Sequence, residues 1–292
     1  VNRFILKFNM FGDLIWEKSL ADEYRIYCLK EKFSTNNIGF LAAGGFLDNG
    51  VESGLILNFD NNGNILDSKI VSDDYYQNGS AQLKDIAENP ITVQCVDADC
   101  NTQTLYTFVG TANASNAVGG NDDLDILLTL YYADDQDENN NNQYDPEIAY
   151  NTTLGKNIDF NLDETYYESA NVVFVPEDFV LNLENEVDGL PENYGLIIGG
   201  SYAIKDAQTC TFPSLYASMG ISFLPFYDIV NWSKLYTVSD YSLTAAAQNG
   251  SEFVIDIIAH EDGYSFLGNA QITSNDWDGY LMNIDYSGTP NP

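Results

Sequence analysis

The sequence predicts an all-β fold, and three observations carry that prediction. Apolar residues alternate with polar ones over short stretches, as expected for half-buried strands. Gly, Asn and Asp separate these stretches at short intervals, which is typical of strands joined by tight turns. A helical spacing of apolar residues is hardly visible anywhere in the 292 residues. Hydrophobic residues make up 45% of the chain and aromatic residues 13%, so we expect a large core rather than wholesale disorder.

A strand bounded by glycines recurs along the chain. Each copy begins near a glycine, continues with aromatic and aliphatic residues, and ends at glycine. The copies occupy residues 39–45, 194–200, 263–268 and, more weakly, 105–110. Recurrence of one motif indicates a protein built from similar units.

A second strand type alternates apolar and polar residues and ends at a tight polar turn. It occupies residues 4–9, 55–60 and 280–285, and the matching turns are residues 9–13, 60–64 and 285–289. In each turn Asn or Asp precedes Gly by three positions. Gly accepts a positive φ and Asn and Asp tolerate it, so this spacing predicts hairpins.

A third strand type follows these turns and carries a lysine at a fixed place. It occupies residues 14–18, 65–69 and 230–234. Two copies also carry a tryptophan, Trp16 and Trp232, whereas Asp67 and Tyr150 stand at the corresponding place in two units. We expect a short outer strand at each of these places.

These motifs define a unit of four antiparallel strands with a first strand of variable sequence. First strands are expected at residues 24–32, 91–96, 171–175 and 253–260. Complete units span about 24–74, 79–156 and 165–238, with partial units at 1–20 and 241–288, all within a single domain, 1–292. Such units stack radially as the blades of a β-propeller. A β-sandwich is the alternative, but it does not require one motif to recur around the chain.

Ring closure has two solutions. Residues 1–20 supply a third and a fourth strand, and residues 241–288 supply a first, second and third strand. Combined, they make one blade with a surplus strand and give a ring of four. Kept separate, they are parts of two blades of a five-bladed, incompletely closed ring. A chain that starts at Val1 in mid-unit favours five blades, and it looks like a mature or truncated chain.

The combined pattern resembles bacterial extracellular β-propeller repeats. Its parts are Gly-aromatic-hydrophobic-Gly, a loop rich in Gly and Asp, a strand ending in Asp-x-x-Gly-Asn, and then Trp-x-Lys. The similar families are the delta-60 and SBBP-type repeats, which are common in secreted and lipid-anchored proteins of Bacteroidetes. The resemblance covers most of the chain and implies an extracellular, cell-surface or periplasmic propeller, but no activity. The long insertions of the later units depart from it.

The net charge of −33 excludes some partners and favours others. Nucleic-acid binding is not expected, because phosphates are neutralised by clustered Lys and Arg and the chain has only 11 basic residues. Anionic lipid is disfavoured for the same reason. No stretch of about 18 apolar residues exists, so no transmembrane helix is expected. Metal cations and a basic protein partner are the natural counterparts of this charge.

Two cysteines predict a small ring. Cys95 and Cys100 bracket four residues, and a disulfide between them is plausible in an exported protein. Four free thiols in a cytosolic protein are the alternative. Zinc is not expected, because a CxxC pair is missing and His260 is the sole histidine.

One acidic loop suggests calcium. The oxygen-bearing side chains of Asp135, Asp137, Asn139 and Asn141 alternate, as at the start of a calcium-binding loop, where alternate side chains converge on one cation. The sixth position lacks the usual Gly and the twelfth lacks the usual Glu, so Asp145 or Glu147 would complete the site. Any bound Ca²⁺ would be structural. A solvated acidic loop without an ion is the alternative.

Two aromatic residues near the C-terminus are candidate ligand contacts. Trp277 and Tyr280 follow an acidic cluster and could stack on a sugar or contact a protein. Catalytic motifs are mostly absent: there is no G-x-S-x-G, no P-loop and no dinucleotide fingerprint. His260 ends an apolar run and is expected at a strand end rather than as a base.

These observations favour a non-enzymatic exported propeller that binds a protein or serves a structural role in a surface or envelope complex. A glycoside hydrolase or a carbohydrate-binding propeller is the alternative. It would use paired carboxylates in a central funnel, and the 44 acidic residues offer many pairs.

Overall fold

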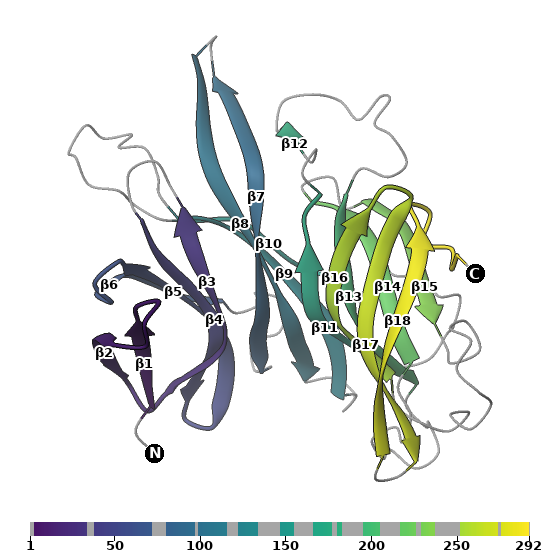
Figure 1. Cartoon of the computed structure of the whole chain (residues 1–292), viewed down its shortest axis with the longest axis horizontal. Coiled ribbons are helices and arrows are strands. Elements are labelled where there is room, and N and C mark those ends of the chain that lie inside the picture. Colours follow the sequence, from purple (N-terminus) through teal and green to yellow (C-terminus); the bar gives the residue numbers. More distant parts are fainter. Residues whose placement is uncertain are drawn as a thin grey trace.

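The computed structural model is all-β, which confirms the predicted fold class (Figure 1). It describes residues 3–33, 38–71, 80–96, 99–115, 122–133, 147–154, 166–176, 180–182, 195–204, 217–225, 229–236, 252–273 and 276–291. Within these ranges the chain forms strands and turns and no helix. The search of the same ranges for a helix able to cross a membrane finds none.

The strands form five antiparallel sets in chain order. The first set is β1 (Arg3–Phe8) and β2 (Leu14–Leu20). The second is β3 (Tyr24–Phe33), β4 (Ile38–Asp48), β5 (Val51–Asp60) and β6 (Ile65–Val71). The third is β7 (Ala81–Val96), β8 (Asp99–Ser115), β9 (Asp122–Tyr132) and β10 (Glu147–Thr153). The fourth is β11 (Tyr166–Phe174), β13 (Leu196–Ile204), β14 (Ala217–Leu224) and β15 (Ile229–Tyr236). The fifth is β16 (Glu252–His260), β17 (Gly263–Thr273) and β18 (Asp276–Asp285).

Within each set, consecutive strands pair with one another in a meander. A single parallel pair, Tyr167 with Leu124, joins the third and fourth sets into one nine-stranded sheet. The short strand β12 (Val180–Asn182) completes that sheet by pairing in parallel with the outer half of β7. The three central sets therefore each have four antiparallel strands, as the sequence predicted.

One predicted first strand is wrong in extent. The sequence placed it at residues 91–96, but β7 already begins at Ala81. The sequence does not predict residues 81–90 as a strand, because the register shifts after Leu83 and Asn89 and Pro90 lies inside the strand. These features interrupt the alternation of side chains on which the prediction depends. The first strands predicted at 24–32 and 253–260 agree with β3 and β16 to within one residue, whereas β11 begins at Tyr166, ahead of the predicted residues 171–175.

Four apolar cores lie between the five sets, one at each junction. Each core takes side chains from the facing sides of two consecutive sets. Neighbouring residues on one strand therefore serve different cores: Ala42 packs toward the first set, whereas Leu41 and Ala43 pack toward the third. This explains the continuous apolar runs of the central strands, because a strand buried on both faces has no polar alternation.

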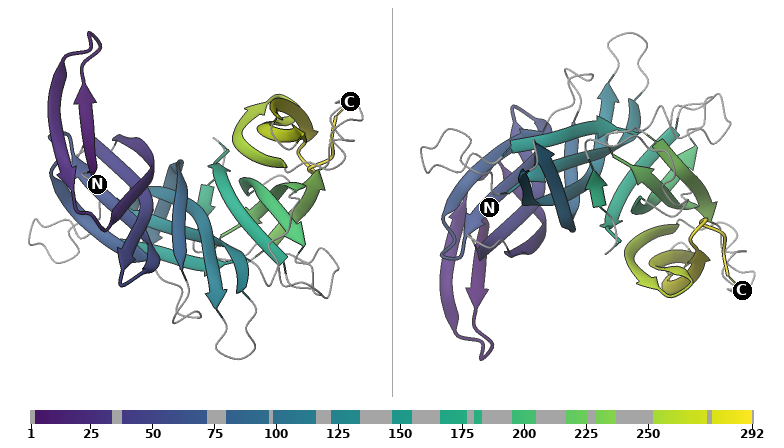
Figure 2. Two further views of the ribbon diagram at one scale, coloured as in Figure 1. Left: turned by 90° about the horizontal axis from the view of Figure 1, so that it is seen from below. Right: turned by 90° about the horizontal axis from the view of Figure 1, so that it is seen from above.

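The sets follow one another along an open arc (Figure 2). β1 and β2 lie at one end of the arc and β16 to β18 at the other, and both views separate the two ends. The described residues form no closed ring, so the predicted propeller with four or five blades is not established by this arrangement. A two-layered sandwich does not describe it either, because the sets pack in series.

A β-bulge recurs in the first strand of each of the last four sets. The register shifts between Ile26 and Cys28 in β3, and the same shift follows Leu83, Ala170 and Val254 in β7, β11 and β16. A glycine of the second strand faces each shift, namely Gly44, Gly110, Gly200 and Gly268.

Close approach of the backbone explains three of these glycines. A Cβ on Gly44 would lie 1.8 Å from the carbonyl oxygen of Arg25, and one on Gly110 would lie 1.8 Å from that of Gln82. The equivalent distance from Gly200 to the Ser169 oxygen is 2.0 Å. Gly44, Gly110 and Gly200 therefore accommodate the bulges that they face, whereas a Cβ at Gly268 would meet the Tyr280 side chain instead.

Candidate functional site: the bulge row and the terminal faces

The bulged first strands are joined by hydrogen bonds from one set to the next. Asp85 lies at the centre of this row. One of its carboxylate oxygens accepts the backbone N–H of Val173 on β11 at 2.9 Å, and the other is 3.4 Å from the Cys28 thiol on β3. A single side chain thus joins three consecutive sets. We refer to the first-strand residues that are joined in this way at and beside the bulges, beginning with Cys28, Asp85 and Val173, as the bulge row.

Burial controls the ionisation of this junction. It raises the pKa of Asp85, although the N–H groups of Val173 and Ile86 act in the opposite direction. It also raises the pKa of Cys28 to about 12, and the nearby Asp85 carboxylate adds to the increase. The thiol therefore stays protonated at neutral pH and can serve as a donor. Reactive cysteines have the opposite property, so Cys28 has the character of a structural residue.

The bulge row continues through Lys84. Its ammonium donates to the Ser169 hydroxyl at 2.8 Å and to the Asn171 side-chain oxygen at 3.3 Å, both on β11. Asn171 in turn donates to the carbonyl oxygen of Val254 on β16 at 3.3 Å. Burial lowers the pKa of Lys84. Successive bulge residues therefore connect β7, β11 and β16 without a break.

A second polar group lies where the second and third sets meet. The buried Glu52 accepts hydrogen bonds from Arg25 at 2.9 Å, Tyr27 at 3.0 Å and Gln82 at 2.8 Å. Arg25 and Glu52 form an ion pair, and Gln82 supplies the contact from β7. Arg25 and Tyr27 belong to the same set as Glu52, so Gln82 alone makes the contact between the sets. The buried charge is paired and hydrogen-bonded, which is the usual condition for burying a charge.

The recurrent tryptophan contacts the turn of the following set. The indole N–H of Trp16 donates to the carbonyl of Asn61 at 3.0 Å, and that of Trp232 donates to Tyr286 at 2.9 Å. Each ring lies against the turn glycine, Gly63 or Gly288, both of which have a positive φ. The Trp-x-Lys strand and the Asx-Gly turn are therefore two halves of one contact between sets. Sequence reasoning found both motifs but not this pairing.

Where tryptophan is replaced, a different contact serves the junction. Asp67 on β6 accepts a hydrogen bond from the Tyr131 hydroxyl on β9 at 2.9 Å. Asn58 donates to the carbonyl of Ala133 at 2.9 Å beside it, and also accepts from the fully buried Lys32 at 3.1 Å. Where Asp67 stands in place of tryptophan, the second and third sets are therefore still in contact, but through different side chains.

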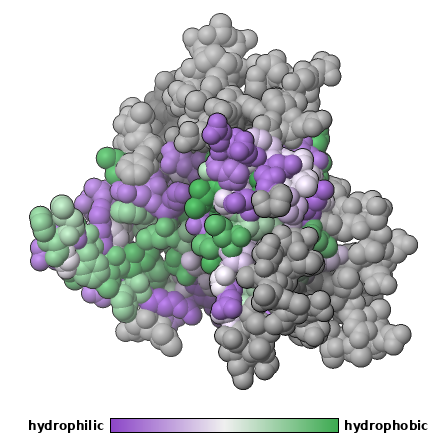
Figure 3. Space-filling view, turned by 45° about the vertical axis from the view of Figure 1, so that its right-hand side comes forward, coloured by the Kyte–Doolittle hydropathy of each residue, from purple (hydrophilic) through white to green (hydrophobic). Residues whose placement is uncertain are grey.

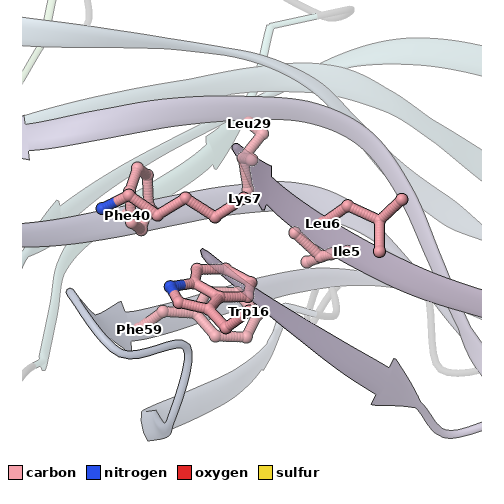
Figure 4. Close-up of a pocket in the computed structure, with 7 residues that line it drawn as sticks. All are labelled: Ile5, Leu6, Lys7, Trp16, Leu29, Phe40 and Phe59. Carbon is pink, nitrogen blue, oxygen red and sulfur yellow. The ribbon is translucent and has the colours of Figure 1, made fainter. Parts of the chain in front are cut away.

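An apolar pocket of about 300 Å³, open solvent included, lies beside Trp16 (Figure 4). Side chains of the first two sets line it, namely Ile5, Leu6, Lys7, Trp16, Leu29, Phe40 and Phe59. The Lys7 ammonium lies 4.7 Å from the centre of the Phe40 ring and donates to the Asn61 side chain. Lys7, the only cationic side chain in this lining, is already bound to an aromatic ring and an amide. We therefore interpret the pocket as a space between the first two sets that their side chains do not fill completely.

The N-terminal hairpin carries exposed apolar residues that the fold does not need. Met10 and Phe11 at its turn are 89% and 81% exposed. The Asn9 side chain closes this turn by accepting the N–H groups of Phe11 and Asp13, both at 2.9 Å. Asp60 closes the equivalent turn of the second set in the same way, and the residues between are asparagines.

Polar residues therefore fit this turn equally well. Apolar residues also gather on the side of the molecule where the N-terminal strands lie, in the face that Figure 3 shows. Among the described residues, Met10 and Phe11 are the most exposed large hydrophobic side chains.

The predicted calcium ligands lie outside the described residues. Asp135, Asp137, Asn139, Asn141 and Asp145 all fall between β9 and β10 in a range that the structure does not describe. Calcium binding there stays a prediction. Among the described residues, no group of three or more His, Cys, Asp and Glu side chains is arranged to hold a metal ion.

The predicted disulfide partners lie opposite each other. Cys95 near the end of β7 pairs with Cys100 near the start of β8 in the antiparallel register. Directly opposed residues have Cα atoms about 4.5 to 5.5 Å apart, which lies within the range that a disulfide requires. The backbone is thus compatible with the predicted bond. Cys28 is a free thiol.

The two predicted aromatic ligand contacts are not brought together. Trp277 is exposed and packs on Phe253, with ring centres 5.4 Å apart. Tyr280 is buried in the core between the fourth and fifth sets, and its hydroxyl is hydrogen-bonded to that of Ser218. The two residues are three apart on β18 and so point to opposite faces. Trp277 remains a surface candidate, whereas Tyr280 contributes to the core.

Comparison with known proteins does not assign the chain to a family. No protein-family model matches the sequence, and a search of curated proteins finds no match.

Proposed function

We propose that the chain is a non-enzymatic β-propeller module that binds a basic protein partner at a cell surface or in an envelope complex. The exposed Met10 and Phe11 at the hairpin tip carry this proposal. The equivalent turn of the second set holds Asn61 and Asn62, so the fold itself gives no reason for two large apolar side chains there. Exposed apolar residues within a polar surrounding are typical of protein-binding surfaces.

The use of buried charge supports a scaffold. Asp85, Lys84 and Glu52 are each bound to groups of a neighbouring set, as described above. Ionisable side chains that are hydrogen-bonded to a neighbouring set hold the two sets together. The serial stacking of four-stranded sets, with first strands joined to one another, supports a propeller whose blades are these sets. A rigid frame of this kind presents its turns at fixed positions, which suits docking.

The charge of the chain supports the choice of partner. A net charge of −33 repels acidic partners and accelerates encounter with basic ones. We therefore expect a partner with an apolar recess surrounded by Lys and Arg.

A photo-reactive amino acid placed at position 11 tests the proposal. In the envelope of the cells that make the protein, we expect it to form one dominant adduct. The same group at Asn62, in the equivalent turn of the second set, is the matched control and should not form that adduct. The adduct partner is then purified, and its affinity for the unmodified chain is measured by calorimetry.

A second variant separates binding from folding. Met10→Asn combined with Phe11→Asn gives the hairpin the residues of the second set's turn, so its melting temperature should stay within about 2 °C. Loss of the anchors should weaken binding of the purified partner at least about tenfold. Equal adducts at positions 11 and 62, or full affinity in the double variant, would refute the proposal.

A further inference from the structure

Lys84 on β7 is a partly buried cation whose hydrogen-bond acceptors are all uncharged. Its ammonium donates to the Ser169 hydroxyl at 2.8 Å and to the Asn171 side-chain oxygen at 3.3 Å, both on β11. The carboxylate of the adjacent Asp85 accepts a backbone N–H of β11 instead. A nearby carboxylate would raise the pKa of Lys84, whereas burial lowers it. Among the residues that the structure describes, this ammonium therefore has no anionic partner.

The bulge itself does not require a lysine. Lys84 is the residue that the register shift leaves unpaired in β7, and the same place holds Tyr27 in β3, Asn171 in β11 and Ile255 in β16. The contact with the following set does not require one either, because Asn171 makes the equivalent contact, to the carbonyl of Val254, with an uncharged amide. Burying part of an ammonium costs free energy that a neutral side chain would avoid. The fold therefore gives no reason for a charge at this position.

Two hydrogen-bond donors of this cluster are left over. A lysine ammonium has three N–H groups, and Lys84 uses two of them. The Ser169 and Thr111 hydroxyls lie 3.0 Å apart and share one hydrogen bond, so one of their two protons is not used between them. Lys84, Ser169 and Asn171 are each partly exposed, so a small ligand in solution has access to these donors.

The charge and the number of the donors indicate which anion fits. One ammonium balances one negative charge, and in a chain of −33 a second charge on the ligand would be repelled. An N–H and an O–H donor in one cluster match the two oxygens of a carboxylate, which accept charge-assisted hydrogen bonds. A singly charged carboxylate therefore suits this cluster better than phosphate or sulfate.

We propose that Lys84, Ser169 and Thr111 bind the carboxylate of a small organic acid at the junction of the third and fourth sets. One carboxylate oxygen accepts the third N–H of Lys84, and the other accepts the remaining hydroxyl proton of the Ser169 and Thr111 pair. The ligand would compensate the partly buried charge and join β7, β8 and β11. This inference does not depend on the protein partner proposed above, because that partner is expected at the hairpin tip.

Titration with sodium acetate tests the proposal by NMR of the whole chain with ¹³C in its lysine side chains. Sodium chloride keeps the ionic strength constant. We expect the Lys84 Cε signal, assigned by its absence from Lys84→Met, to shift saturably. The signal of Lys69, which is paired with Asp67 at 3.5 Å on β6, is the internal control and should not shift saturably. Sulfate should bind at least about tenfold more weakly than acetate.

Variants distinguish a binding site from a purely structural contact. Acetate should raise the melting temperature of the unmodified chain above its value in chloride, because the site exists only in the folded state. Lys84→Met should abolish this rise, whereas Lys69→Met should keep it. Ser169→Ala removes one hydroxyl and should weaken acetate binding at least about tenfold. Met10→Asn combined with Phe11→Asn should leave acetate binding unchanged, which separates this site from the hairpin tip.

Three results would overturn the proposal. They are a Lys84 signal that does not respond to acetate, sulfate binding as tight as that of acetate, and an unchanged affinity for acetate in Ser169→Ala. If a variant at this junction does not fold, the titration of the unmodified chain decides the question.

Discussion

β5 in the second set and β1 in the first set have nearly the same sequence pattern but different environments. Both alternate large apolar residues and end at an Asx-Gly turn. Leu57 on β5 is fully buried, whereas its counterpart Leu6 on β1 is 38% exposed. The strands differ in what lies outside them, because β5 has a set on either side and β1 has one. Burial in this molecule is therefore a property of stacking, and the strand alone does not determine it.

The largest effect is expected where a repeated glycine meets a bulge. In Gly44→Ala the new Cβ would lie 1.8 Å from a backbone oxygen of β3. Backbone cannot rotate away as a side chain can, so we expect a loss of more than about 4 kcal/mol in the free energy of unfolding, or failure to fold.

Gly279→Ala is the matched control for this substitution. A Cβ at Gly279 on β18 meets its nearest neighbour at 3.9 Å, so the cost should stay below about 1 kcal/mol. Urea denaturation measures both variants. A mild effect at Gly44 would mean that the bulge does not require glycine.

The comparison of β5 with β1 predicts the next effect. Leu57→Ala should lower the free energy of unfolding by about 3 kcal/mol, because it leaves a cavity in a closed core. Leu6→Ala should cost less than about 1 kcal/mol, since that side chain already contacts water. Chemical denaturation at low protein concentration checks both values. Equal losses would show that the stacked sets do not make the difference.

The smallest effect concerns the junction at Asp85. Asp85→Ala removes the acceptor of the Val173 N–H and should cost about 1–3 kcal/mol. Asp85→Asn keeps an acceptor but cannot titrate. Because burial raises the pKa of Asp85 above its ordinary 3.8, the folded protein holds this proton more tightly than the unfolded chain. The stability that the bound proton on Asp85 contributes is complete below pH 3.8 and is lost as the pH rises through the raised pKa of the folded state.

The unmodified chain should therefore lose stability relative to Asp85→Asn as pH rises from about 3.8 toward neutral. Asp60→Asn is the control of opposite sign. Slight burial raises the pKa of Asp60, but hydrogen bonds from Asn64 and Asn62 outweigh it and lower the pKa below 3.8. Its contribution is present above pH 3.8 and is lost as pH falls through the lowered value. Denaturation curves at several pH values measure both differences, and a common sign would contradict the assignment.

Much of the fold could be predicted because the units repeat. The Asx-Gly turns, the alternating third strands and the glycine within each second strand that faces a bulge all lie where local chemistry requires them. The inner half of β7 was missed because bulges and Pro90 disrupt the two-residue period on which strand prediction depends. The bulge row was missed for a related reason, since a bulge is defined by the partner strand and leaves no regular pattern in its own strand. Its only sequence signal was the facing glycine.

The candidate site was harder to predict than the fold. Trp277 and Tyr280 are close in sequence, but the alternation of β18 sends one outward and the other into a core. The opposed positions of Cys95 and Cys100 follow from a hairpin that brings near neighbours together, and the disulfide itself stays a prediction. The contact of Trp16 with the turn at Asn61 joins residues 45 positions apart, and sequence alone gave no means of pairing them.

The sequence by itself determined the strands, the turns and the grouping of strands into units of four, because these depend on residues near one another in the chain. Tertiary structure decided which faces are buried, how Asp85 and Lys84 join consecutive sets, and that an arc leaves exposed apolar residues at either end. These outcomes depend on neighbouring sets rather than on neighbouring residues. Identical alternation gives a core strand in the middle of the stack and an exposed surface at its ends.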